Sequence, residues 1–214
     1  MIDSTLIPTR YFQVSGYVLA GGDSSRMGRD KAALEVGGLA MVLRAARLVE
    51  PLVSKRAGVL VIGPPNKYAE FGLKSIPDDL PGMGPLAGIA TAVRTSLSPW
   101  SLIVGCDMPY LSTEWLVHLL ARGVPSNADI VVAEGPGGIE PLCGLYHKRC
   151  EASFATALAR GTRKITDAFA SRQVLTITAD EVQPFDPHGL LFKSVNTPED
   201  LAEAEKKFAE IATE

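Results

Sequence analysis

The sequence predicts an α/β fold in which a mostly parallel β-sheet is covered by helices on both faces. Two observations carry this prediction. Short apolar runs of strand length alternate along the chain with segments of helical period. The 214 residues are enough to bury a sizeable core, and no internal repeat, low-complexity stretch or linker divides them. We therefore expect one domain over residues 13–214, preceded by a leader at residues 1–12.

The strands are predicted from apolar runs. The first, Val14–Leu19, reads as a short buried strand and stands directly before a Gly-rich loop. The others, in chain order, are Val59–Ile62, Leu102–Val104, Ile130–Ala133, Leu142–Tyr146 and Val174–Thr178.

Amphipathic helices lie between these strands. Three of them are marked by apolar residues at helical spacing, namely Val42, Leu43, Ala46 and Val49, then Leu86, Ile89, Ala90 and Val93, then Leu116, Leu119 and Leu120. The third is expected to start near Ser112 or Thr113. The last helix has the clearest start, because Thr197 suits an N-cap, Pro198 the first helical position and Asp200 a capping box. Its expected buried stripe is Leu201, Ala204, Phe208 and Ile211.

Composition narrows the function classes. The chain has 24 acidic and 21 basic residues, a net charge of -3, which disfavours a general nucleic-acid binder. Its odd count of three cysteines contains no Cys-x-x-Cys pair, which disfavours a disulfide framework or a zinc ribbon. We expect Cys106, Cys143 and Cys150 to be buried apolar side chains; the spacing of Cys143, His147 and Cys150 is the weak metal-site alternative. No signal peptide or membrane-length apolar run is visible, so a cytoplasmic protein without membrane contact is expected.

The loop after the first strand is the strongest functional signal. Gly21 and Gly22 let the backbone turn sharply and approach a ligand, and successive N–H groups in such a turn can hold anionic oxygens. Three cations follow at Arg26, Arg29 and Lys31. This combination suits a polyphosphate, with a Gly-rich surface turn as the alternative. The loop is not a Walker A motif, because Ala32 stands where that motif needs Ser or Thr.

A second loop, Ile76–Gly88, leads into a predicted helix. Asp78 or Asp79 could accept hydrogen bonds from a base with amide and amino donors, such as guanine; an ordinary Asx turn is the alternative. The glycines of Gly82-x-Gly84 also loosely resemble a dinucleotide fingerprint, which leaves an NAD(P)-dependent oxidoreductase open as a different class of function.

A third segment places Asp107 just after an apolar strand. A carboxylate at a strand end facing a phosphate site is a natural Mg²⁺ ligand, since Mg²⁺ is usually held by one or two carboxylates, phosphates and waters. A turn-forming Asp before Pro109 is the structural alternative.

Together these segments resemble the molybdenum cofactor guanylyltransferase family. The resemblance covers about residues 14 to 205 in order, through Leu19–Lys31, Gly84–Gly88, Cys106–Pro109, Pro141-Leu142 and Asn196–Leu201. It implies a Rossmann-like nucleotidyltransferase fold of the nucleotide-diphospho-sugar transferase type that uses GTP and Mg²⁺.

The resemblance also implies roles for individual residues. Leu19, Ala20 and Gly21 would contact the nucleotide through the backbone, and Lys31 would pair with phosphate. Asp78 would read guanine, Asp107 would contact the nucleotide and hold Mg²⁺, and Arg26 would steady the triphosphate. The catalytic set is therefore Arg26, Lys31 and Asp107. Two positions depart from the family pattern: Ile62-Gly63 stands where a polar residue is common, and Ser194-x-Asn196 replaces Asn-x-Asn.

The implied activity is transfer of GMP from GTP to Mo-molybdopterin with release of pyrophosphate, with a molybdoenzyme or its chaperone as a further partner. A cytidylyl- or sugar-phosphate nucleotidyltransferase of the same fold is the nearest alternative. A nucleotide-sensing module without catalysis is another. For the acceptor pocket the sequence offers Glu140, Pro141 and the Arg163-Lys164 pair as candidates.

Overall fold

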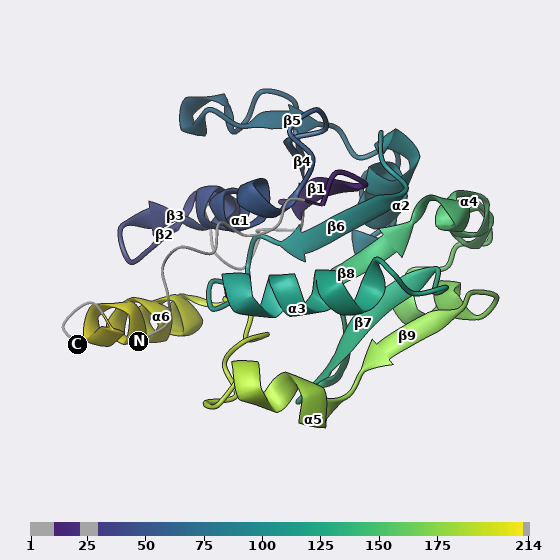
Figure 1. Ribbon diagram of the computed structural model, residues 1–214. Coiled ribbons are helices and arrows are strands. Elements are labelled where there is room, and N and C mark those ends of the chain that lie inside the picture. Colours follow the sequence, from purple (N-terminus) through teal and green to yellow (C-terminus); the bar gives the residue numbers. More distant parts are fainter. Residues whose placement is uncertain (1–10, 22–29, 212–214) are drawn as a thin grey trace.

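A seven-stranded sheet forms the centre of the described part of the molecule (Figure 1). The computed structural model describes residues 11–21 and 30–211. The strand order is β5-β4-β1-β6-β8-β7-β9. The strands are β1 (Val14–Leu19), β4 (Val59–Ile62), β5 (Lys74–Ile76), β6 (Trp100–Gly105), β7 (Ile130–Gly135), β8 (Gly138–His147) and β9 (Val174–Ile177).

The sheet is parallel except at β8. β1 pairs in parallel with β4 and with β6, and β5 and β9 pair in parallel with β4 and β7. β8 is antiparallel to both of its neighbours, because the tight turn between Gly135 and Gly138 reverses the chain after β7. The prediction of a mostly parallel sheet is therefore confirmed.

Six α-helices are described, with several short 3₁₀ segments and one small hairpin. The α-helices are α1 (Met41–Val49), α2 (Pro85–Thr95), α3 (Thr113–Gly123), α4 (Glu151–Ala159), α5 (Ala179–Val182) and α6 (Pro198–Ile211). The 3₁₀ segments are Lys31–Ala33, Glu50–Leu52, Ala69–Phe71, Lys148–Cys150, Ile165–Phe169 and Gln183–Phe185. The hairpin pairs β2 (Glu35–Val36) with β3 (Leu39–Ala40).

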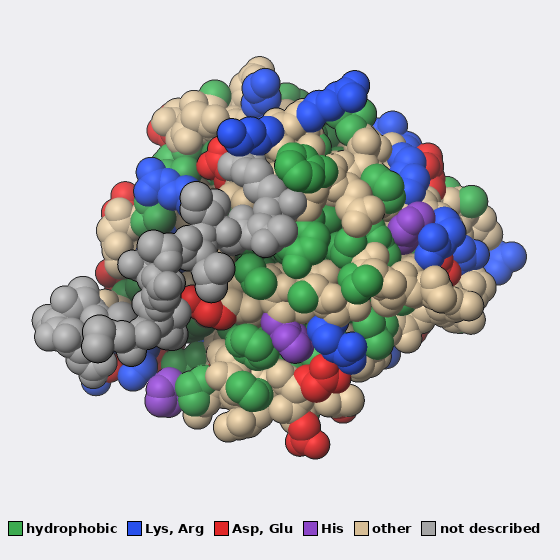
Figure 2. Space-filling view, in the orientation of Figure 1, with side chains coloured by type: hydrophobic (Ala, Val, Ile, Leu, Met, Phe, Trp, Pro, Cys, Tyr) green, Lys and Arg blue, Asp and Glu red, His purple; other side chains and the backbone are tan. Residues whose placement is uncertain are grey.

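Helices cover both faces of the sheet, as predicted (Figure 1). Successive side chains of a strand point to opposite faces. In β1, Val14 and Val18 therefore pack in the cluster that contains residues of α1, α3 and α5, whereas Tyr17 and Leu19 pack in the cluster under α2 and α4. On the face drawn in Figure 2, hydrophobic side chains gather in the middle and charged side chains of both signs surround them.

The last helix packs on the small hairpin and begins with the predicted capping box. Thr197 Oγ1 accepts from the Asp200 backbone N–H at 3.1 Å, and Asp200 Oδ2 accepts from the Thr197 backbone N–H at 2.8 Å. Ala204 is fully buried against Val36, with half-buried Leu201 and Phe208 packed around the cluster they form. The predicted stripe is confirmed at these three positions; the side chain of Ile211 lies outside the described part.

The three cysteines are free and buried, as expected. Cys143 Sγ accepts from Trp115 Nε1 at 3.3 Å, and burial raises the pKa of the Cys143 thiol to about 12. Cys150 Sγ donates to the Asp129 carbonyl at 3.3 Å. At neutral pH such thiols are protonated core groups rather than nucleophiles or ligands.

Tyr11, the first described residue, lies within the expected leader. Its backbone N–H donates to the Leu52 carbonyl at 2.9 Å, and it forms a β-bridge with Val53.

Among the described helices, none combines the length and the apolar character that crossing a bilayer requires.

Candidate active site

Four parallel strands end in line at one edge of the sheet. Leu19 at the end of β1 pairs with Gly105 of β6 and Ile62 of β4, and Ile62 pairs with Ile76 of β5. Ligands of open α/β sheets bind beyond this carboxyl edge. The segments that leave the four strand ends are Ala20-Gly21, Gly63, Pro77–Asp79 and Cys106-Asp107.

The end of β1 presents backbone rather than side chains. Leu19 is 8% exposed, and a Cβ on Gly88 of α2 would lie 3.3 Å from Leu19 Cδ2, so α2 packs tightly over it. Ala20 N donates to the Ile62 carbonyl at 3.0 Å. Gly21 is exposed, and a Cβ there would meet nothing within 4 Å. Of these three residues Gly21 is therefore the most open to a ligand, while the Leu19 carbonyl accepts from the Cys106 backbone N–H at 3.0 Å. Backbone contacts of Leu19, Ala20 and Gly21 with a nucleotide, which the family resemblance implies, stay a prediction.

Neighbouring residues Lys67 and Tyr68 hold both sides of the Gly-rich loop. The Tyr68 hydroxyl donates to the Ala20 carbonyl at 3.2 Å, and Lys67 Nζ lies 3.1 Å from Asp30 Oδ2. Asp30 also accepts from the backbone N–H of Ala32, which starts the short 3₁₀ helix that carries the predicted lysine. Residues 22–29, with predicted Arg26 and Arg29, lie outside the described residues. The two described flanks of this loop are thus anchored to one segment that follows β4.

Lys31 contacts the predicted metal ligand directly. Its Nζ donates to Asp107 Oδ2 at 2.9 Å and to Asn196 Oδ1 at 2.7 Å. The side chains of Lys31 and Asp107 are only 18% and 19% exposed. The Val195 backbone N–H donates to the Asp107 carbonyl at 2.8 Å, which fixes the segment containing Asn196 beside β6. Three segments far apart in the sequence therefore meet around one ammonium group.

The other carboxylate oxygen of Asp107 lies over the end of β6. A Cβ on Gly105 would come within 2.7 Å of Asp107 Oδ1, so glycine makes room for the carboxylate there. The described part of the chain provides this oxygen with no hydrogen-bond donor. Among the described residues, Asp107 thus has one oxygen bound to Lys31 and one without a hydrogen-bond donor.

Glu140 lies on the same side, at the start of antiparallel β8. Burial raises the pKa of its carboxyl, and the negative charge of Asp107 raises it further. Pro141 follows, and its carbonyl accepts from the Tyr146 hydroxyl at 2.5 Å. Glu140, one of the two β8 residues that the sequence suggested for the acceptor side, is therefore close enough to Asp107 for their charges to interact, and Pro141 is its neighbour in the chain.

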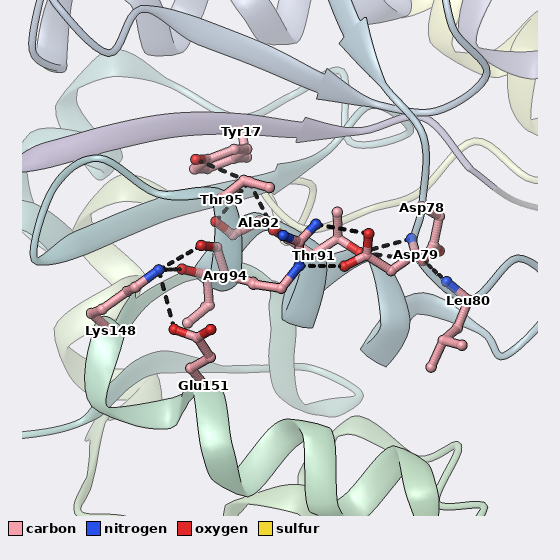
Figure 3. Close-up of polar contacts among 11 residues, drawn as sticks. Tyr17, Asp78, Asp79, Leu80, Thr91, Ala92, Arg94, Thr95, Lys148 and Glu151 are labelled. Carbon is pink, nitrogen blue, oxygen red and sulfur yellow. Dashed lines mark hydrogen bonds and ion pairs between the residues drawn. The ribbon is translucent and has the colours of Figure 1, made fainter.

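The two adjacent carboxylates after β5 have different partners (Figure 3). Asp79 binds Arg94 through both oxygens, at 2.6 and 2.8 Å. Asp78 Oδ1 accepts from the Leu80 backbone N–H at 3.0 Å and from the Thr91 hydroxyl at 3.4 Å. Of the two alternatives left open by the sequence, Asp79 is thus occupied by a cation, and Asp78 is the better candidate for reading a base.

The loop that follows turns sharply into α2. Gly82 and Gly84 have φ values of +81° and +83°, a region that side chains other than glycine rarely adopt. Pro85 occupies the first turn of α2, as predicted. A Cβ on Gly84 would lie 3.9 Å from the Arg163 carbonyl, so the Arg163-Lys164 segment passes next to this turn.

The structure explains one departure from the family pattern and adds residues that the sequence did not assign. Ile62 is buried, and a Cβ on Gly63 would lie 3.2 Å from the Tyr68 ring, so an aromatic side chain fills the end of β4. The unassigned residues are Tyr68, Thr91 and, as the partner of Lys31, Asn196. Asn196 had a signal in the sequence, as part of the Asn196–Leu201 segment that resembles the family, and Thr91 could have been noticed as a hydroxyl among the apolar residues of α2.

Comparison with known proteins identifies the fold and the family. The fold matches that of nucleotidyltransferases, including 2-C-methyl-D-erythritol 4-phosphate cytidylyltransferase from Thermus thermophilus (TM-score 0.66, 18% identity, 92% of this chain and 100% of that one). Molybdopterin-guanine dinucleotide biosynthesis protein A from Archaeoglobus fulgidus is more similar, with a TM-score of 0.78 and 25% identity over 92% of this chain and 99% of that one.

The fold and the edge site together define a Rossmann-like nucleotidyltransferase. Residues 16–176 match the family model described as the MobA-like NTP transferase domain, and the chain belongs to that family. A molybdenum cofactor guanylyltransferase from Rhodopseudomonas palustris is 35% identical, covering 88% of this chain and 91% of its own. The predicted fold class and family are both confirmed.

Proposed function

We propose that the protein transfers GMP from GTP to Mo-molybdopterin, forming the guanine dinucleotide cofactor and releasing pyrophosphate. Family membership supports the reaction class, and the guanylyltransferase relatives support the substrates. The structural observation that carries the proposal is the contact of Lys31 with Asp107 at the carboxyl edge of the sheet. This contact brings together a cation that could bind phosphate and a carboxylate that could bind a divalent metal ion.

The nucleotide would lie along this edge. Backbone groups of Leu19, Ala20 and Gly21 would contact it, while Lys31 and Arg26 would pair with the triphosphate. Asp78 would read the guanine, since an ionised carboxylate only accepts hydrogen bonds and guanine offers adjacent N–H and amino donors. The register supports this layout, because the four segments start from strand ends that lie in line.

Asp107 also suits a Mg²⁺ ion. Its Oδ1 has no donor in the described structure, and carboxylate oxygens are the ligands that Mg²⁺ prefers. When bound, Mg²⁺ would neutralise charge on the phosphate oxygens. Lys31 would then exchange its contact with Asp107 for one with phosphate, and Asn196 would keep the ammonium within reach.

The chemistry requires little from the protein beyond positioning. An oxygen of the acceptor phosphate attacks the α-phosphorus of GTP, the bond between that phosphorus and the bridging oxygen to the β-phosphate breaks, and pyrophosphate leaves. A phosphate monoester is largely ionised at neutral pH, so no general base is needed. Catalysis would rest on alignment and on charge neutralisation by Lys31 and Arg26.

The acceptor would approach from the β8 side of Asp107. Glu140 and Pro141 lie there, and the Arg163-Lys164 segment passes near the start of α2. We propose these residues as the acceptor side, residues 13–214 as one nucleotidyltransferase domain, and a molybdoenzyme or its chaperone as a later partner. A cytoplasmic location stays a prediction from the sequence.

Calorimetric titration with GTP, CTP, ATP and NAD, each with and without Mg²⁺, tests the proposal. Selective Mg²⁺-dependent binding of GTP, followed by pyrophosphate release when Mo-molybdopterin is added, is the expected result. Preference for CTP would keep the chemistry but change the substrate. Binding of NAD with no nucleoside triphosphate bound would refute the site assignment and support the dinucleotide alternative at Gly82-x-Gly84.

A further inference from the structure

Thr91 is a buried hydroxyl on the otherwise apolar face of α2. It is 1% exposed, between Ile89 and Val93, which are fully buried. A hydroxyl is costly in such a place unless it forms hydrogen bonds. Its Oγ1 accepts from the Asp79 backbone N–H at 3.1 Å and donates to Asp78 Oδ1 at 3.4 Å. One side chain thus ties α2 to the loop after β5 (Figure 3).

The two hydrogen bonds of Thr91 determine which carboxylate oxygen is left for a ligand. Asp78 Oδ1 is shared by Thr91 and the Leu80 backbone N–H, whereas both oxygens of Asp79 bind Arg94. Within the described residues, Asp78 Oδ2 has no donor. The loop therefore presents Asp78 Oδ2 as an acceptor, while hydrogen bonds to Oδ1 fix the orientation of the carboxylate.

The position of the loop separates it from the transfer chemistry. Three strand spacings lie between β5 and β6 in the order β5-β4-β1-β6. At about 4.8 Å each, they put the start of the Asp78 loop about 14 Å from the strand end that carries Asp107. A change in the orientation of Asp78 should therefore alter nucleotide binding and leave the transfer step intact.

We infer that Thr91 is the positioning residue for nucleobase selection, because it fixes the loop from which Asp78 offers its free carboxylate oxygen to the N–H and amino donors of guanine. The inference rests on the proposed guanylyl transfer. It predicts that the selectivity of the enzyme depends on a hydroxyl that never touches the nucleotide. Guanine is distinguished from hypoxanthine, which lacks the amino donor, and from adenine, which presents an acceptor nitrogen on this edge.

The test compares T91V with T91S and with a matched control on the same helix. Valine keeps the shape of threonine and removes both hydrogen bonds, whereas serine keeps the hydroxyl. Thr95 lies one turn further on; its hydroxyl bonds to the carbonyls of Thr91 and Ala92 and to Tyr17, away from the 78–80 loop. T95V therefore removes a comparable hydroxyl from α2 without affecting the loop.

Steady-state kinetics with GTP, ITP and ATP are the readout, with thermal melting as the folding control. In T91V we expect the KM for GTP to rise about tenfold, the preference for GTP over ITP to fall by a similar factor, and kcat to stay within about twofold. T91S and T95V should keep the wild-type preference. If T91V does not fold, T91A gives the same comparison.

Three outcomes separate this inference from the proposed function. If the wild type prefers GTP but T91V keeps the same GTP-to-ITP ratio, the role of Thr91 is refuted and the transfer activity stands. If T91V lowers kcat and raises KM by the same factors for all three nucleotides, Thr91 has only a structural role. A wild type that does not select GTP refutes the proposed function itself.

Discussion

Replacing Lys31 with Met should separate the catalytic role of its charge from any role in stability. Lys31 Nζ lies 2.9 Å from Asp107 Oδ2, so the direct Coulomb attraction is roughly 6 kcal/mol at an effective dielectric constant of about 20. Desolvation and side-chain ordering offset most of that, and pairs that keep some exposure contribute about 1 kcal/mol or less. For a chain of this size, a loss of that order lowers Tm by roughly 2–4 °C.

The expected effect on catalysis is much larger. Removing one preorganised hydrogen-bond donor from a developing anion typically costs a factor of about 10²–10³ in rate. We therefore expect K31M to lower kcat/KM for GTP by about that factor while remaining folded. The assay is pyrophosphate release at saturating acceptor, with circular dichroism melting in parallel.

A matched lysine serves as the control. Lys193 Nζ pairs with Glu203 Oε1 at 2.6 Å, a comparable lysine–carboxylate contact outside the candidate site. K193M should change Tm slightly and leave kcat/KM unaltered. A K31M enzyme with kcat/KM within threefold of the wild type would refute the assignment of Lys31 to the phosphates.

Three shorter predictions follow. Asp107→Asn should abolish Mg²⁺-dependent turnover in the pyrophosphate assay and lower Tm by no more than K31M does, since both variants lose the same ion pair, and full activity would exclude Asp107 as the metal ligand. Tyr68→Phe removes only the hydroxyl that holds the Ala20 carbonyl, so the KM for GTP should rise about threefold to tenfold, and an unchanged KM would exclude a positioning role. Burial alone would raise the pKa of Asp129, but hydrogen bonds from Arg149 and the Gln173 backbone, with nearby positive charge, lower it overall. Its contribution to stability is therefore complete above the ordinary carboxyl pKa of about 4 and is lost as the pH falls further, so urea unfolding of Asp129→Asn should show a shallower acid dependence than the wild type.

The sequence predicted the strands best where a buried strand is made mostly of apolar residues. The runs Val14–Leu19 and Val59–Ile62 match β1 and β4 at both ends. In contrast, β5 was missed because Lys74-Ser75-Ile76 forms an edge strand with only one apolar residue. Helix α4 was missed because only two of its side chains, Phe154 and Leu158, are buried.

Among the candidate site residues, those in a recognisable local segment could be predicted, whereas contacts between distant residues could not. Lys31 and Asp107 could be predicted because each belongs to a segment that leaves the end of a recognisable strand. The contact of Lys31 with Asn196 joins residues 165 positions apart, and no local pattern reports such a distance. Likewise, the distinction between Asp78 and Asp79 depends on Arg94, fifteen residues away on α2, and becomes visible only when the helix packs beside the loop.

The antiparallel strand accounts for the asymmetry of the site. Parallel strands contribute only their carboxyl ends to this edge, and those ends carry the residues proposed for the nucleotide. Because β8 runs the opposite way beside β6, it brings its beginning to the same edge, where the charge of Asp107 acts on Glu140. Residues on the β8 side are therefore independent of the β-to-α loops proposed for GTP. A second substrate would meet its own set of side chains there, with Asp107 at the boundary between the two.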